Sequence, residues 1–222
     1  MIEASSSSPP ARRFLMLHGV QHRRPRQHWL WWLSETLRQQ GEQVLYPQFP
    51  SPEQPSLREW IDLLHAELAQ LGDRERVVVC HSLGCTLWLR ATQTLPADLR
   101  VTRVLLVSPL GEQAFTAADG NQEFTPQRVD RELLAAASTR PPHVVASATD
   151  PYAPADLHAW TTALGLPCDV LPAAGHITPH DGYGPWPAAL AWCLREQTPV
   201  TAADGACSRV RPELREGAGG GR

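Results

Sequence analysis

A short strand, a serine and a helix follow one another without a break between residues 76 and 91. Residues 76–80 (Arg-Val-Val-Val-Cys) form a β-branched apolar run that is typical of a buried parallel strand. Residues 85–91 continue as a mostly apolar helix. We expect Ser82 to lie on the sharp turn between them, the arrangement known as a nucleophile elbow, where the helix N-terminus favours negative charge beside the hydroxyl.

One residue departs from the usual G-x-S-x-G pattern of this turn. Cys80 occupies the position of the first glycine, where the strand and helix backbones approach closely, whereas Gly84 keeps the second. Cysteine is small enough for this position. The alternative interpretation is an ordinary strand–serine–helix junction in another kind of α/β protein.

Predicted strands and helices alternate along the rest of the chain. The strands are expected at 14–17, 43–46, 77–80, 103–108, 143–147 and 169–171, and the helices at 29–39, 57–71, 83–94, 129–137, 154–164 and 187–196. This alternation favours an α/β domain with a doubly wound, mostly parallel sheet and right-handed crossovers.

The domain is expected to span residues 12–198, between disordered tails at 1–11 and 199–222. Its longest segment without periodicity, 109–128, is too short for a separate cap domain. Phe115 and Phe124 in this segment are expected either to line a substrate pocket or to anchor a surface loop.

The composition excludes several classes of protein. A net charge of −3 gives no reason to expect nucleic acid or a membrane surface as a partner. All 20 basic residues are arginine, which excludes a Schiff-base lysine, a pyridoxal lysine and a P-loop lysine. No apolar run reaches membrane-spanning length, and the N-terminus lacks the hydrophobic core of a signal peptide. The five cysteines show no C-x-x-C spacing and suit a reducing compartment, so we expect a cytoplasmic protein.

A serine hydroxyl at neutral pH needs a base, and the base needs an acid that orients it. In an elbow protein these groups follow in the order serine, acid, histidine. Asp150 comes directly after the predicted strand 143–147, at the sheet edge where ligands gather in α/β proteins. His176 follows the strand 169–171 and a glycine. We therefore expect Ser82, Asp150 and His176 to act together.

Other acids and histidines are weaker candidates. Asp150 has an alternative role as a cap of the turn before Pro154. Asp130 and Asp156 lie in predicted helices, and His180 lies in the same loop as His176. No histidine pair has the spacing and carboxylate neighbour of a zinc site, so we expect no metal and no other cofactor.

The negative charge of an acyl-transfer intermediate needs two backbone N–H donors. Leu83, directly after the serine, is expected to supply one. The loop after the first strand is expected to supply the other from Val20 or Gln21, with Gly19 allowing the backbone to turn towards the serine. His18 and Gly19 are expected to border the substrate pocket.

The order of these motifs along the chain is specific when taken together. They are Leu17-His18-Gly19, the helix with Trp29 and Trp32, Tyr46-Pro47-Gln48-Phe49-Pro50 with Trp60, His81-Ser82-Leu83-Gly84-Cys85, Thr149-Asp150-Pro151-Tyr152, and Gly175-His176 followed by Gly182-Tyr183-Gly184-Pro185-Trp186-Pro187. Over about residues 13–196 the chain resembles the small α/β-hydrolases related to retinoblastoma-binding protein 9 and the bacterial YdeN-like serine hydrolases.

The resemblance implies a compact α/β-hydrolase without a large cap and a triad of Ser82, Asp150 and His176. It supplies no substrate. The retinoblastoma-binding signature L-x-C-x-E is absent, because residues 166–170 read Leu-Pro-Cys-Asp-Val, so no such protein partner is expected.

Three hypotheses about function follow. The first is a serine hydrolase that cleaves small-molecule carboxylic esters, with thioesters and small amides as further candidates. The second is an acyltransferase or carrier-linked thioesterase that uses the same triad. The third is a non-catalytic interaction module on a hydrolase fold, for which the distances among Ser82, His176 and Asp150 are the discriminating observation.

Overall fold

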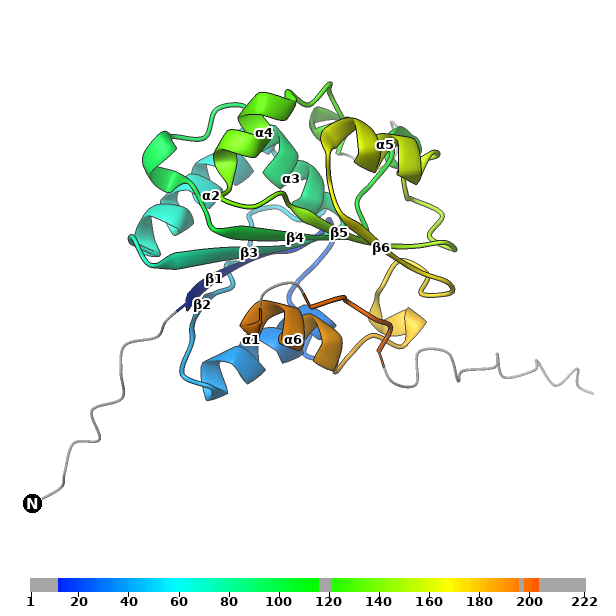
Figure 1. Cartoon of the computed structure of the whole chain (residues 1–222), viewed down its shortest axis with the longest axis horizontal. Helices are drawn as coiled ribbons and strands as arrows, with labels where there is room; N and C mark the ends of the chain where they lie inside the picture. The colour runs from blue at the N-terminus through cyan, green and yellow to red at the C-terminus, as the bar shows by residue number, and fades with distance from the viewer. Residues whose placement is uncertain (1–11, 116–120, 196–197, 204–222) are drawn as a thin grey trace, which may run out of the picture.

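A single sheet of parallel strands runs through the centre of the computed structural model, which describes residues 12–115, 121–195 and 198–203 (Figure 1). The strands lie in the order β2-β1-β3-β4-β5-β6. Their bounds are β1 Arg12–Leu17, β2 Gln43–Leu45, β3 Glu75–His81, β4 Arg103–Val107, β5 His143–Ser147 and β6 Cys168–Leu171. The predicted tail at 1–11 and residues 204–222 of the other predicted tail lie outside the described residues. No described helix is both long and apolar enough to cross a membrane.

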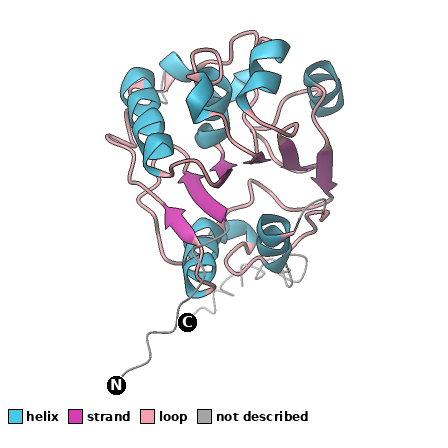
Figure 2. Ribbon diagram, turned by 60° about the vertical axis from the view of Figure 1, so that its left-hand side comes forward, coloured by secondary structure: helices cyan, strands magenta, loops and turns pink. Residues whose placement is uncertain are grey.

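Helices cover both faces of this sheet (Figures 1 and 2). Helices α1 (Trp29–Gln39) and α6 (Pro187–Leu194) pack on one face. The other face carries α2 (Leu57–Gln70), α3 (Leu83–Ala91), α4 (Arg131–Ala137) and α5 (Leu157–Leu164). Short 3₁₀ turns lie in the loops at Ala97–Leu99, Glu112–Ala114, Gln122–Phe124 and Pro179–Asp181. The expected doubly wound architecture is confirmed.

Two apolar cores, one on each face, explain why the strand sequences are continuous apolar runs. Alternate residues of β1 and β3 point to opposite faces, because side chains alternate along a strand. Leu15, Leu17, Val78 and Cys80 belong to the core under α2, α3 and α4, whereas Phe14, Met16, Val77 and Val79 belong to the core under α1 and α6.

Helices α4 and α5 begin two to three residues later than predicted. The Asp130 side chain accepts hydrogen bonds from the Glu132 and Leu133 amides at 2.8 and 3.2 Å. The Asp156 side chain accepts from the Ala159 amide at 2.8 Å. These carboxylates satisfy N–H groups that have no partner inside the helix, so both aspartates cap helices and neither lies beside Ser82.

Residues 198–203 also contact the domain, whereas the sequence predicted a domain that ends at 198. Val200 is buried, and its amide donates to Asp169 at 2.7 Å. The Trp186 ring N–H donates to the Thr201 carbonyl at 2.7 Å. This short segment has no periodic pattern, which explains why the sequence assigned it to the disordered tail.

The strand order reverses beside β1. The chain passes from β1 to β2 on one side and then returns to β3 on the other side. At such a switch point the loops that leave the carboxyl ends of the two strands separate and form a crevice for ligands. The loop after β1 and the turn after β3 therefore meet at one edge of the sheet.

Arg103 fastens α6 to the sheet. Its guanidinium is buried, donates to the carbonyls of Trp192 and Cys193 at 2.8 Å each, and lies 3.2 Å from Glu75. It also stacks on the Trp192 ring at 5.0 Å. The two carbonyls belong to the last turn of α6, where backbone acceptors have no partner within the helix.

Arg103→Met should lower the free energy of unfolding by roughly 3 kcal/mol, because buried carbonyls and Glu75 lose a charged partner. Urea denaturation measures this loss. Arg58→Met is the matched control. The Arg58 side chain is 91% exposed, and its ion pair with Asp62 is long, at 3.9 Å, so its loss should change the free energy of unfolding by less than about 0.5 kcal/mol. Equal effects of the two substitutions would contradict the assigned role of Arg103.

Candidate active site

Ser82 lies on the sharp turn between β3 and α3, as predicted. Its backbone has φ 56° and ψ −121°, a conformation that residues other than glycine rarely adopt. The Ser82 amide donates to the Val107 carbonyl at 3.0 Å, and the Ser82 carbonyl accepts from the Cys85 amide at 2.9 Å. Strained backbone of this kind persists where its surroundings hold it, and it lifts the hydroxyl above the sheet edge.

The two small residues around Ser82 meet different requirements. A Cβ added to Gly84 would lie 2.4 Å from the Leu17 carbonyl oxygen, so only glycine allows α3 to approach the end of β1. Cys80 is fully buried in β3 and packs in the core beneath α3. The turn therefore forms with cysteine in place of the first glycine.

Ser82, His176 and Asp150 form one hydrogen-bonded chain. The His176 Nε2 lies 2.9 Å from Ser82 Oγ, and the His176 Nδ1 lies 2.8 Å from Asp150 Oδ2. Because the carboxylate accepts, His176 carries a proton on Nδ1, and Nε2 is free to accept the Ser82 proton. The other carboxylate oxygen, Oδ1, accepts from the Tyr152 amide at 2.9 Å, and the Tyr152 ring contacts the His176 ring edge-on at 5.0 Å.

Two loops bring Asp150 and His176 together. Ser147, the last residue of β5, accepts hydrogen bonds from the Thr149 and Ala174 amides at 3.2 and 2.9 Å. Thr149 in turn accepts from the Gly175 amide at 3.2 Å. These bonds join the loop after β5, which carries Asp150, to the loop after β6, which carries His176.

The two expected backbone donors lie beside the serine. Leu83 is the first residue of α3, and Gly19 approaches so closely that an added Cβ would lie 2.9 Å from the Ser82 Cβ. The Gln21 amide donates to the Pro52 carbonyl at 2.6 Å, so of the two candidates from this loop Val20 is the one that stays a prediction. Within the described part of the chain, the Leu83 and Val20 amides donate to no other group.

A cavity of about 340 Å³ opens beside Ser82. Gly19 lines it, as expected, and so does Val20. The sequence did not indicate the rest of the wall, which comes from loops that meet only in the fold. Its lining also includes Gln21, His22, Pro25, His28, His81, Leu110, Ala114, Asn121, Tyr152 and Thr178. Polar side chains therefore outnumber apolar ones in this cavity.

Three of the predicted pocket residues lie elsewhere. His18 is fully buried behind Gly19, where its Nε2 accepts from the Phe49 amide at 3.0 Å. Phe124 is fully buried against the Trp60 ring at 5.3 Å, and Phe115 packs on the same core. Both phenylalanines thus anchor the segment after β4, which was the alternative interpretation. His180 is exposed, and among the described residues it makes no hydrogen bond to the serine.

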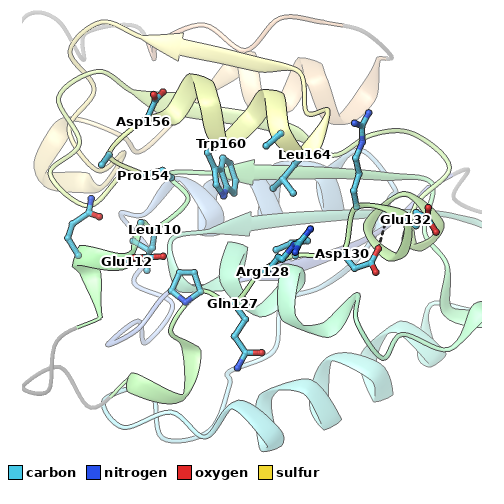
Figure 3. A pocket seen from close by; sticks show the side chains of 17 residues that line it. Leu110, Glu112, Gln127, Arg128, Asp130, Glu132, Pro154, Asp156, Trp160 and Leu164 are labelled. Carbon is cyan, nitrogen blue, oxygen red and sulfur yellow. Dashed lines mark hydrogen bonds between the residues drawn. The ribbon is translucent and has the colours of Figure 1, made fainter.

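A larger cavity of about 1150 Å³ lies between α5 and the segment before α4 (Figure 3). Trp160 and Leu164 project into it from α5, opposite Arg128. It shares Leu110 with the cavity beside Ser82 but contains none of the three hydrogen-bonded residues. We therefore assign the chemistry to the smaller cavity.

Buried imidazole rings form a row that ends at His176. Ring centroids are 5.1 Å apart for His18–His22, 4.6 Å for His22–His28, 5.0 Å for His28–His81 and 5.3 Å for His81–His176. Burial lowers the pKa of His18 to about 4, of His22 to about 2 and of His28 to about 3, and it lowers the pKa of His81 as well. These four rings are neutral at physiological pH, so no imidazolium among them opposes a positive charge that forms on His176.

Residues 14–194 match the family described as serine hydrolase. This chain belongs to the serine hydrolase family. It is similar to YdeN of Bacillus subtilis strain 168, described as a hydrolase, with 31% identity over 127 residues that make up 57% of this chain and 65% of YdeN. The aligned segment thus spans slightly less than two thirds of YdeN.

Solved structures show the same fold. The ydeN gene product of B. subtilis matches with a TM-score of 0.70 and 24% identity, over 82% of this chain and 97% of that one. Est1E from Butyrivibrio proteoclasticus with ferulic acid bound matches with a TM-score of 0.57 and 18% identity, over 79% and 85% of the two chains. The α/β-hydrolase fold and the YdeN-like serine hydrolase family are confirmed. The likeness to retinoblastoma-binding protein 9 stays a prediction.

The buried imidazoles make the stability of this serine hydrolase sensitive to acid. Below about pH 6.5 the unfolded chain binds protons on these rings, whereas the folded chain does not until pH 4 or lower. Their contribution is complete above pH 6.5 and is lost as the pH falls. The free energy of unfolding should therefore decrease between pH 6.5 and 4, by up to about 1.4 kcal/mol per pH unit for each ring.

His28→Asn tests this origin. The His28 Nδ1 accepts from the Leu30 amide at 3.1 Å and caps α1, and an asparagine oxygen serves as the same kind of cap. The variant therefore keeps the cap and removes one titrating ring. Urea denaturation at several pH values in this range gives the free energy of unfolding as a function of pH. The slope of this dependence should be smaller in the variant, by about the contribution of one imidazole ring. An unchanged slope would show that His28 does not contribute.

Proposed function

We propose that this protein hydrolyses small carboxylic esters through a Ser82–His176–Asp150 triad. The observation that carries the proposal is the pair of hydrogen bonds that His176 makes, 2.9 Å to Ser82 and 2.8 Å to Asp150. Both are within the range at which a nucleophile and its base exchange a proton. A non-catalytic interaction module needs no such alignment, so these distances favour the enzyme.

In the proposed reaction the Ser82 Oγ attacks the acyl carbonyl carbon while the His176 Nε2 takes its proton. Asp150 holds the imidazole in the tautomer with a proton on Nδ1 and stabilises the imidazolium. The Leu83 and Val20 amides donate to the oxyanion. His176 then protonates the leaving alcohol. The acyl group stays on Ser82 until water, deprotonated by His176, releases it as a carboxylic acid.

The surroundings support this assignment of roles. Asp150 receives hydrogen bonds from both His176 and the Tyr152 amide, so its carboxylate is fixed and desolvated. Desolvation strengthens the attraction between the carboxylate and the imidazolium. The neutral rings of His28 and His81 beside the site add no opposing charge.

The size of the cavity limits the substrate. About 340 Å³ is at the lower end of the volumes of ligand sites, and the segment after β4 adds no large cap. This supports a short acyl group. Est1E, which was solved with ferulic acid bound, shows that a related fold holds a small aromatic acid, and it supports the choice of a small-molecule substrate.

The cysteines support the proposed cytoplasmic location. Cys80, Cys85, Cys168 and Cys193, the cysteines in the described part of the chain, are all unpaired thiols. Burial raises the pKa of Cys85 and of Cys193, the latter to about 12, so these thiols stay protonated and unreactive. Unpaired cysteines suit a reducing compartment.

Ser82→Ala should abolish covalent labelling by a fluorophosphonate probe and reduce ester turnover at least about 1,000-fold, because the nucleophile is lost. Labelling is read by intact-protein mass spectrometry. Ser108→Ala is the matched control: Ser108 is a fully buried serine directly after β4, with φ 50° and no partner for its hydroxyl. It should label like the wild type. Full ester turnover by Ser82→Ala would refute the assignment.

Turnover should decrease as the acyl chain lengthens. A p-nitrophenyl ester series from acetate to octanoate should give the highest kcat/KM at two to four acyl carbons, on the order of 10-fold above octanoate, because the cavity is small. A maximum at octanoate would place the acyl group in the larger cavity under α5 instead.

A further inference from the structure

Two buried ring N–H groups hold the backbone that follows His176. The His81 Nε2 lies 3.0 Å from the carbonyl oxygen of His176, and the Trp29 Nε1 lies 3.0 Å from the carbonyl oxygen of Ile177. A carbonyl oxygen only accepts, so both rings donate, and His81 carries its proton on Nε2. The two rings contact each other edge-on, at 90° and 5.7 Å.

The backbone that they hold is strained. Ile177 has φ 53°, a conformation that β-branched residues rarely adopt. Its side chain is fully buried, and its amide donates to the Ala174 carbonyl at 3.0 Å. A strained residue persists only where the structure around it over-determines its conformation. Here the constraint falls on the residue next to His176.

Core packing alone does not account for His81. The ring is 3% exposed, and its Nδ1 has no hydrogen-bond partner. An unpaired buried nitrogen costs stability that an apolar side chain of similar size would not lose. Its hydrogen bond to His176 is thus the contact that distinguishes this histidine from an ordinary core residue.

The hydrogen bond from His81 to His176 matters for the site because His81 is the neighbour of Ser82 in the chain. His81 is the last residue of β3, and Ser82 follows it directly. The end of one strand therefore holds the His176 loop through His81 and presents the hydroxyl to the His176 ring through Ser82. The 2.9 Å distance between Ser82 Oγ and His176 Nε2 depends on both attachments.

We propose that His81 and Trp29 are positioning residues that hold the His176 loop and so orient its imidazole towards Ser82. This inference rests on the proposed function. Neither residue donates to the reacting groups. Removal of either N–H should let the His176 ring drift, and a displacement of about 1 Å is sufficient to cost about 100-fold in rate.

The variants His81→Leu and Trp29→Phe each remove one of the two ring N–H donors and place an apolar side chain at the same position in the core. Each should lower kcat for a short ester and the rate of fluorophosphonate labelling by about 10- to 100-fold, with KM within about threefold of wild type. His81→Gln retains an N–H at similar reach and should recover most of the labelling rate.

Trp60→Phe is the matched control. Trp60 is also fully buried, and its ring N–H donates to the Pro50 carbonyl at 2.8 Å, away from His176. The Trp60→Phe variant should lose as much free energy of unfolding as Trp29→Phe, measured by urea denaturation. Its rate of fluorophosphonate labelling should stay within about threefold of wild type.

The inference is overturned if His81→Leu and Trp29→Phe label as fast as Trp60→Phe. It is also overturned if His81→Gln labels as slowly as His81→Leu, because the donor would then be irrelevant. Failure of the wild type to label at Ser82 has a different meaning: it refutes the proposed function, and this inference falls with it.

Discussion

The close approach of α3 to the end of β1 is the constraint on which the rest of the site depends. Gly84 lets the helix backbone reach the Leu17 carbonyl, and any side chain there would overlap it. This approach places Gly19 against Ser82, next to Leu83 and Val20, whose amides are the proposed oxyanion donors. The site's donors are backbone groups, so the fold itself sets their positions, and side-chain rotamers have little influence.

His176 differs from the buried histidines near it in the groups that its ring nitrogens contact. Four imidazoles near the crevice are neutral because they are desolvated, and local hydrogen bonds assign protons to particular nitrogens. Among the described residues, His176 is the one histidine with a carboxylate on one ring nitrogen and a hydroxyl on the other. A buried row of uncharged rings gives the crevice polar walls and leaves the stabilisation of positive charge to Asp150.

The order of strands and helices could be predicted from the sequence, because buried parallel strands consist of continuous apolar runs. The sequence also predicted that Ser82, Asp150 and His176 lie close together, since each follows a strand at the same sheet edge, and the structure brings them within hydrogen-bond distance. The sequence left open whether Phe124 lines the pocket or anchors its loop, and it did not predict the contacts of His81 and Trp29. The bond from Trp29 to Ile177 joins residues 148 positions apart, and the bond from His81 to His176 joins residues 95 apart. No local pattern encodes such contacts, because they arise only when separate elements pack.

The loops that follow the strands differ in the residues that they contribute to the site. The loops after β1, β3, β5 and β6 carry the hydrogen-bonded Ser82, His176 and Asp150 and the two proposed oxyanion donors. The described residues of the segment after β4 include none of these groups, although Leu110, Ala114 and Asn121 contribute to the cavity wall. Substitutions in this segment can therefore change the shape of the cavity without touching the hydrogen bonds among Ser82, His176 and Asp150. The fold thus separates a segment that shapes the cavity wall from the loops that hold the hydrogen-bonded residues.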